Sequence, residues 1–319
     1  MGLIQRLSIL SIVAAAGCAT DPAAPTPDPN ALLPGFELPP APAADVGMRF
    51  ITPPTYNLEP GSSHEICAWT GVKVDHTIDI RKANGYQLIA GHHIILFASK
   101  LNLPAGTSRE CTDADMASFR QIAATGAEGL PSEAPGDLVY RIDPDMYIVL
   151  QEHYINAGDN PIDSQSALDI TFAEPGHAYT PSHSIAFLNT QLDLKPGPNA
   201  IDVHCAMQND VNGWFSLPHM HEWGTKFNAS ITHDGVSSPM FDELAWTKEY
   251  MFSPPTKQWD INAPTPLVAG DTVDVHCEWN NTTPNDLHFG SEMCVFYLQT
   301  VDKQNLGNLD CDNGTWGAF

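Results

Sequence analysis

From residue 48 onward, short runs of alternating apolar and polar residues follow one another along the chain. These runs are rich in β-branched and aromatic residues and are bounded by Gly, Pro or Asn, a pattern typical of strands and turns. They predict eight strands, at 77–81, 93–97, 147–154, 166–172, 184–188, 228–232, 272–279 and 294–301. Segment 112–124 instead predicts a helix, with Thr112 as its cap and Asp113 and Asp115 in its first turn. Many strands with few helices predict an all-β fold of sandwiches or a barrel.

Length and charge limit the number of domains and the kind of partner. The chain has 319 residues, 43% of them apolar, which is enough to fill one large core or two ordinary ones. Roughly 270 ordered residues would fit two sandwiches of about 130 residues each. The formal net charge is −24, with 14 Lys and Arg against 38 Asp and Glu. A chain this acidic is repelled by phosphate backbones, so we expect no nucleic-acid partner.

The first residues predict export. A short apolar run at 7–16 follows Arg6 and ends in small residues directly before Cys18. This arrangement resembles a bacterial lipobox, in which the cysteine is acylated and becomes the mature N-terminus. The resemblance implies a signal peptide at 1–17 and a lipid anchor on the periplasmic or cell-surface side of a bacterial membrane. Plain cleavage that leaves a free Cys18 is the alternative.

A tether follows at 18–47. Eight prolines lie between positions 22 and 42, and such a stretch favours extended polyproline II over a packed core. It predicts a spacer that holds the folded part away from a membrane, with an ordered Pro-rich loop as the alternative.

Six further cysteines predict disulfides in an oxidising compartment. They are Cys67, Cys111, Cys205, Cys277, Cys294 and Cys311. Six cysteines allow 15 pairings, and spacing alone does not choose among them. The tetrapeptide Asp-Val-His-Cys occurs twice, at 202–205 and 274–277, which suggests a pair of neighbouring strands.

Three groups among the 13 histidines predict metal binding. His219 and His221 are two residues apart, so in a strand both rings lie on one face. His92 and His93 point to opposite faces unless a bulge or a strand end brings them together. His153 lies within a third strand-like run. Imidazole suits copper, zinc, iron and nickel, so these groups predict a metal without naming it.

Other histidines are interpreted as ordinary polar residues: His64, His76, His177, His183 and His233.

A methionine near the histidines narrows the choice of metal to copper. Segment 290–298 predicts a strand with Met293, Val295 and Tyr297 on one face and Cys294 on the other. A thioether beside two imidazoles makes a soft site that favours Cu(I), although core packing is the ordinary role of a buried methionine.

Taken together, four motifs resemble the copper type II, ascorbate-dependent monooxygenases, the family of peptidylglycine α-hydroxylating monooxygenase and dopamine β-monooxygenase. The motifs are His-His before an apolar strand at 91–97, Leu-Gln-Glu-His-Tyr at 150–154, His-Met-His-Glu-Trp-Gly at 219–224 and Glu-Met-Cys at 292–294. They occur in the family's order and span roughly residues 52–311.

The resemblance implies two jelly-roll domains, at 48–176 and 177–319, that face one cleft. It implies an electron-transferring copper held by His92, His93 and His153, and an oxygen-binding copper held by His219, His221 and Met293. Ascorbate would reduce both coppers, and oxygen from O2 would be inserted into a C–H bond. The resemblance also implies that the cysteines pair as Cys67–Cys111, Cys205–Cys311 and Cys277–Cys294. Gln151 shares the predicted strand face of His153, so we expect it to orient that ligand or its water.

Departures from the family concern the substrate. Leu217 stands where peptide-amidating members carry an Arg that grips a carboxylate, and Val295 stands where they carry Asn. Tyr297 matches a tyrosine of the family's pocket. We therefore expect an apolar pocket with one hydroxyl, a small neutral or apolar substrate, and a monomer with no partner besides the membrane.

Two alternatives belong to other classes. The first is a copper-binding lipoprotein that stores, senses or delivers the metal without turnover. The second is a sugar-binding or glycan-cleaving double jelly roll, which rests on fold alone. A blue-copper carrier is disfavoured because Cys294 faces away from Met293 in the predicted strand.

Overall fold

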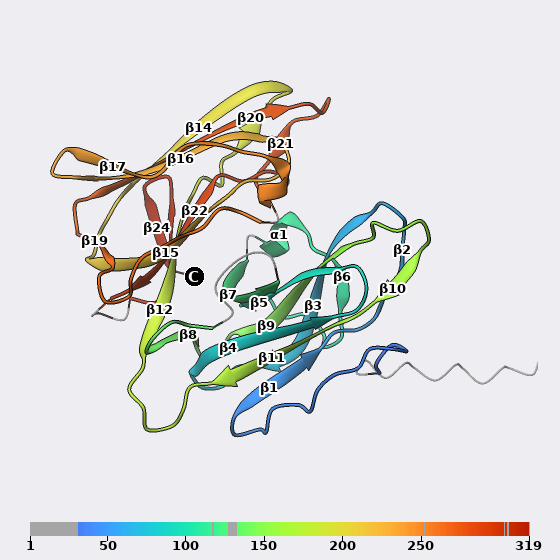
Figure 1. Ribbon diagram of the computed structural model, residues 1–319. Helices are drawn as coiled ribbons and strands as arrows, with labels where there is room; N and C mark the ends of the chain where they lie inside the picture. Colours follow the sequence, from blue (N-terminus) through green and yellow to red (C-terminus); the bar gives the residue numbers. More distant parts are fainter. Residues whose placement is uncertain are drawn as a thin grey trace, which may run out of the picture.

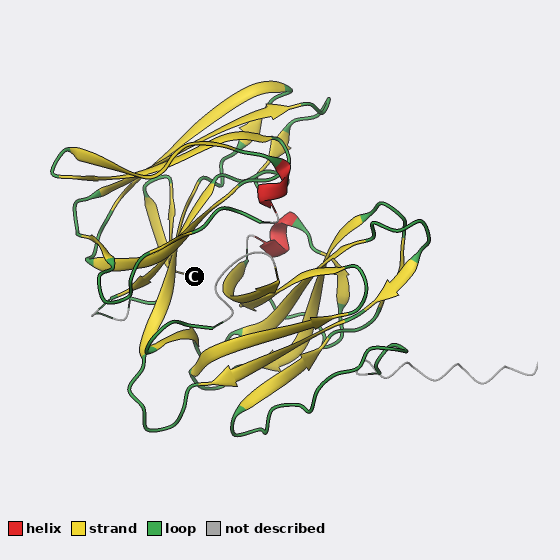
Figure 2. Ribbon diagram, in the orientation of Figure 1, coloured by secondary structure: helices red, strands yellow, loops and turns green. Residues whose placement is uncertain are grey.

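The computed structural model describes residues 31–116, 118–126, 133–251, 253–302, 304 and 306–318. The predicted signal peptide, Cys18 and the first part of the tether lie outside the described residues. Strands make up almost all of the regular structure, which confirms the all-β prediction (Figures 1 and 2). Each of the eight predicted strands falls on an observed one.

The N-terminal half consists of two facing sheets. The first has the order β6-β3-β9-β5-β7, with β6 at Ser108–Glu110, β3 at Ser63–Lys73, β9 at Tyr147–Ile155, β5 at Gly91–Ser99 and β7 at Phe119–Gly126. The second has the order β1-β11-β4-β8, with β1 at Gly47–Ile51, β11 at Ser166–Phe172, β4 at Ile78–Gln87 and β8 at Leu138–Ile142. A small ribbon pairs β2 (Thr55–Leu58) with β10 (Ile162–Ser164). Buried aliphatic side chains from both sheets, such as Ile80, Ile94, Leu150 and Leu168, form the core between them.

The C-terminal half repeats the two-layer arrangement. One layer has the order β12-β22-β15-β18, with β12 at Thr180–Leu188, β22 at Val295–Val301, β15 at Val211–His219 and β18 at Lys257–Gln258. Around its edges lie β19 (Thr265–Leu267), β23 (Leu309–Asp312) and β24 (Thr315–Ala318). The other layer has the order β14-β20-β16-β17, with β14 at Gly197–Ala206, β20 at Thr272–Asn281, β16 at Gly224–His233 and β17 at Val236–Ala245. Two further short strands, β13 (Asp193–Leu194) and β21 (Leu287–His288), pair with each other, and the 3-10 helix η1 spans Lys248–Met251.

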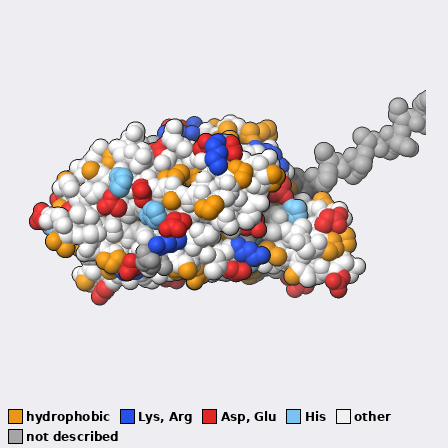
Figure 3. Space-filling view, turned by 90° about the horizontal axis from the view of Figure 1, so that it is seen from above, with side chains coloured by type: hydrophobic (Ala, Val, Ile, Leu, Met, Phe, Trp, Pro, Cys, Tyr) orange, Lys and Arg blue, Asp and Glu red, His pale blue; other side chains and the backbone are white. Residues whose placement is uncertain are grey.

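The duplicated Asp-Val-His-Cys motif forms a pair of neighbouring strands, as the sequence suggested. In the antiparallel pairing of β14 with β20, Asp202 lies opposite His276 and His204 opposite Asp274. Each histidine shares a 2.6 Å hydrogen bond with the aspartate facing it. Figure 3, seen from the side of this sheet, shows histidine side chains next to acidic ones.

The two halves share one continuous sheet. Three residues of β12, beginning with Thr180, pair in parallel with three residues of β8, beginning with Leu138. The C-terminal strand β15 also packs into the N-terminal core through Trp214, Phe215 and Leu217. The halves are therefore held together by backbone pairing as well as by apolar contact (Figure 1). The domain boundary at 176/177 and the jelly-roll connectivity stay predictions.

The helix predicted at 112–124 is wrong beyond its first turn. Helix α1 covers only Asp113–Met116, capped as expected by Thr112, whose Oγ1 accepts a hydrogen bond from the Asp115 backbone N–H at 3.2 Å. From Phe119 the chain continues as β7, which pairs with β5. Pairing with a long neighbouring strand overrides the local helical pattern, because short apolar runs fit either structure.

Three disulfides join the pairs that the family resemblance implied. They are Cys67–Cys111, Cys205–Cys311 and Cys277–Cys294. Such bridges are typical of proteins in an oxidising environment outside the cytosol. No helix in the described part of the chain has the length and apolar character needed to cross a membrane.

Candidate metal sites and the cavity between them

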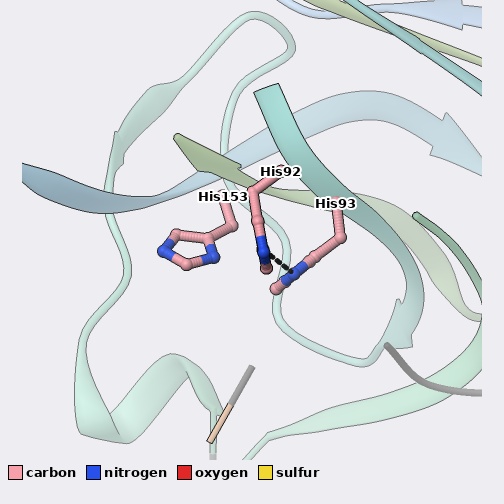
Figure 4. Close-up of side chains that lie close together, drawn as sticks. All are labelled: His92, His93 and His153. Carbon is pink, nitrogen blue, oxygen red and sulfur yellow. Dashed lines mark hydrogen bonds between the residues drawn. The ribbon is translucent and has the colours of Figure 1, made fainter. Parts of the chain in front are cut away.

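A three-histidine cluster lies where β5 meets β9. One ring nitrogen from each of His92, His93 and His153 lies within 4.8 Å of the others, a spacing that can hold a metal ion (Figure 4). The pairing of β5 with β9 is interrupted by a bulge between Gly91 and His93, so His92 is the extra residue on its strand. This bulge is the device by which two adjacent histidines can both face His153.

The electrostatics of this cluster suit a metal ligand set. Burial, followed by the neighbouring His93 and His92, lowers the pKa of His153 to about 3. Its imidazole is therefore neutral at neutral pH, with a lone pair available to a metal. A 2.8 Å hydrogen bond between Ser63 Oγ and His153 Nε2 fixes the orientation of the ring.

A second pair of histidines lies at the end of β15. The Nε2 atoms of His219 and His221 are 3.1 Å apart, close to the spacing of two ligands that each bind a metal at about 2.0 Å. His221 Nδ1 donates a hydrogen bond to the Ser291 carbonyl at 3.1 Å, which leaves the lone pair of His221 on Nε2. Burial, with a smaller contribution from His221, lowers the pKa of His219 to about 3, so this ring is neutral as well.

Met293 and Tyr297 lie beside this pair. Met293 is 5% exposed, packs with Ala186 and Leu188, and lines the same cavity as both histidines. The ring of Tyr297 is centred 6.5 Å from that of His219. Burial raises the pKa of Tyr297 to about 12, so its hydroxyl keeps its proton at neutral pH. The set of two imidazoles and a thioether fits a soft ion such as Cu(I).

One cavity of about 150 Å³ receives side chains from both sites. His93 and Gln151 reach it from the N-terminal half, and His219, His221 and Met293 reach it from the C-terminal half. The short helices α1 and η1, close together in Figure 2, contribute a methionine each. The remaining apolar lining consists of Ile95, Phe97, Met116, Phe119, Leu217, Met251, Pro254 and Tyr297.

The charge of the cavity favours uncharged ligands. Among the described residues that line it, Glu65 is the only carboxylate and none is Lys or Arg. A carboxylate-bearing molecule would meet no Lys or Arg side chain among these residues to compensate its desolvation.

Val295 does not have the pocket position expected of it, and Gln151 makes contacts that were not expected. Val295 does not line the cavity but is 1% exposed and packs with Ala186 and Leu188 beneath it. Gln151 lines the cavity, and its amide donates to Glu65 Oε2 at 3.1 Å and to Met116 Sδ at 3.5 Å. The role of Gln151 in orienting His153 or a water bound there stays a prediction.

Several lining residues were not anticipated, among them Glu65, Met116 and Met251. Glu65 lies opposite His153 in the pairing of β3 with β9, and only knowledge of that pairing identifies it. The histidines that the sequence predicts to be ordinary polar residues include three that form hydrogen-bonded pairs with carboxylates. His64 pairs with Glu110, His177 with Asp137 and His233 with Asp271.

Comparisons with known proteins do not assign a family. No protein-family model matches the chain, and no curated protein sequence does. Similar solved structures include PNGase F, a glycosylasparaginase from Flavobacterium meningosepticum, at 11% identity over 85% of this chain and 99% of that one, with a TM-score of 0.34. The major capsid protein P2 of bacteriophage PM2 is similar at 9% identity over 80% of this chain and 99% of that one, with a TM-score of 0.28. These likenesses are too weak to carry an argument about function.

Proposed function

We propose that this chain is a copper-dependent monooxygenase that hydroxylates a C–H bond of a small neutral or apolar molecule, using O2 and an ascorbate-like reductant. The observation that carries the proposal is the single cavity lined both by His93 of the three-histidine cluster and by His219, His221 and Met293. A storage protein needs no pair of chemically different sites facing one space. The family resemblance of the four motifs supports the same conclusion.

Each ligand set has a separate task in this proposal. His92, His93 and His153 would hold one copper, and His219, His221 and Met293 the other. When bound, the coppers would supply one-electron storage and the activation of dioxygen. The rings of His153 and His219 bind without first losing a proton, because both are neutral.

The cavity walls would select and position the substrate. Leu217, Phe97 and Phe119 exclude water and contact an apolar body. Tyr297 keeps its hydroxyl proton and can donate a hydrogen bond to a bound molecule. The Gln151 amide is already engaged by Glu65 and Met116, which holds this part of the wall in place.

We further propose that the protein is exported and lipid-anchored through Cys18. The three disulfides support an oxidising compartment. The lipobox-like sequence before Cys18 and the Pro-rich stretch after it support an anchor followed by a spacer.

Oxygen uptake by the copper-loaded protein with ascorbate tests the proposal against storage. A screen of small hydrophobic compounds should find one that accelerates uptake and yields a hydroxylated product. The His153→Ala variant should abolish this acceleration, whereas the matched surface variant His177→Ala should keep it. Binding of copper without substrate-dependent uptake by the wild type would favour storage or delivery.

A further inference from the structure

Glu292 is a fully buried carboxylate beside the candidate oxygen-binding site. Its side chain is 0% exposed, and ionised groups are almost never found so deep unless their charge is compensated. Every hydrogen-bond partner of this carboxylate in the described part of the chain is an uncharged N–H group. Four such groups donate to it, from four different residues.

Three of the four donors belong to the segments that carry His221 and Met293, and the fourth, Trp279, belongs to β20. Glu292 Oε2 accepts from the backbone N–H of His221 at 3.0 Å and from that of Met293 at 3.2 Å. It also accepts from the indole N–H of Trp279 at 2.8 Å, while Oε1 accepts from the backbone N–H of Trp223 at 2.8 Å. One carboxylate therefore joins the turn after β15 to the start of β22.

The same turn is held from its other side. Trp246 Nε1 donates to the His221 carbonyl at 3.0 Å, and the backbone N–H of Asn280 donates to the Trp223 carbonyl at 2.9 Å. With these bonds made, the turn that carries His221 depends on Glu292 for two of its N–H groups. In sequence, Glu292 is separated from this turn by about 70 residues, so only folding brings them together.

We propose that Glu292 is a positioning residue that fixes the backbone of His221 relative to that of Met293, so that imidazole and thioether can bind the same ion. This inference rests on the proposed function, because it assumes that the two side chains share a metal. Glu292 does not itself contact the cavity: it acts through the backbone of its neighbours. Gln cannot accept all four bonds, because its amide turns an N–H towards one of the donors. Asp keeps the carboxylate but is one methylene shorter, so it cannot reach all four donors.

The experiment compares the wild type with Glu292→Gln and Glu292→Asp by X-ray absorption of the copper-loaded, reduced protein. Both variants should lose most of the copper–sulfur scattering and bind the second copper about 10- to 100-fold more weakly. The three-histidine cluster shares no residue with Glu292 and its four donors. The copper held by this cluster should therefore bind with unchanged affinity, and it acts as the internal control. Unchanged sulfur scattering in Glu292→Gln would overturn the inference.

A measurement on the wild type alone keeps the inference testable if the variants do not fold. In the metal-free protein, the backbone amides of His221, Trp223 and Met293 should be protected from hydrogen exchange to the level of the neighbouring strands. Free exchange at these amides would overturn the inference. If the amides are protected but the wild type shows no copper–sulfur scattering, the proposed metal site is refuted. The hydrogen bonds that Glu292 accepts from the backbone would still hold His221 and Met293 relative to each other.

Discussion

The Trp279→Phe substitution measures the strength of the bond to the buried Glu292 carboxylate, and the chain offers a matched control. Trp279 and Trp214 are 1% and 0% exposed, and each indole N–H donates one 2.8 Å hydrogen bond. The acceptor is the Glu292 carboxylate in the first case and the neutral hydroxyl of Ser182 in the second. Replacement by Phe removes the same atoms from each, so the packing losses largely cancel.

The expected difference follows from the acceptor's charge. A hydrogen bond to a charged group contributes about 1.5–3 kcal/mol and a neutral one about 0.5–1.5 kcal/mol. Neither acceptor is left without a partner, since Glu292 keeps three donors and Ser182 still bonds to Gln299. Trp279→Phe should therefore lower the free energy of unfolding by about 1 kcal/mol more than Trp214→Phe.

Urea unfolding followed by far-ultraviolet circular dichroism is the suitable assay, because each variant removes one of the seven tryptophans that dominate fluorescence. Equal losses in the two variants would show that the bond to Glu292 is no stronger than a neutral one.

Three other predictions concern the pocket, the anchor and the disulfides. The Leu217→Arg variant should bind small carboxylates about tenfold or more tightly than the wild type does, since a hydrogen bond to a charged group contributes about 1.5–3 kcal/mol. Unchanged affinity in calorimetry would mean that the side chain at position 217 does not contact the ligand. Cys18→Ala should move the protein from the detergent phase to the aqueous phase, and continued detergent partitioning would place the anchor elsewhere. Joint replacement of Cys205 and Cys311 by Ala opens a bridge that spans 106 residues and should cost about 5 kcal/mol by loop entropy; a loss below about 1 kcal/mol in urea unfolding would refute this estimate.

The parts of the site that could be predicted from sequence are those set by local geometry. The spacing of two predicts that the rings of His219 and His221 lie together, and their Nε2 atoms are 3.1 Å apart. His221 reaches this position from the turn just after β15, not from the strand itself. A bulge was named as the condition for His92 and His93 to act together, and the bulge is present between Gly91 and His93. The disulfide pairs came from the resemblance alone, because spacing could not select them.

The parts that could not be predicted depend on contacts between distant segments. Segment 112–124 has a helical pattern, yet the second half of this segment pairs with the edge of β5 and forms strand β7. Glu292 looks like an ordinary charged residue until the turn after β15 is brought against it. Met116 and Met251 reach the cavity only because two short helices from opposite halves meet there. In each case the deciding contact is non-local.

The central claim is that Met293 binds copper together with His219 and His221, and copper X-ray absorption of the reduced protein tests it most directly. The wild type should show a copper–sulfur contribution, and Met293→Ile should lack it. Ile keeps similar apolar bulk, so the fold should lose less than about 1.5 kcal/mol of stability. Sulfur scattering that persists in Met293→Ile would mean that Met293 only packs against its neighbours, and would contradict the claim.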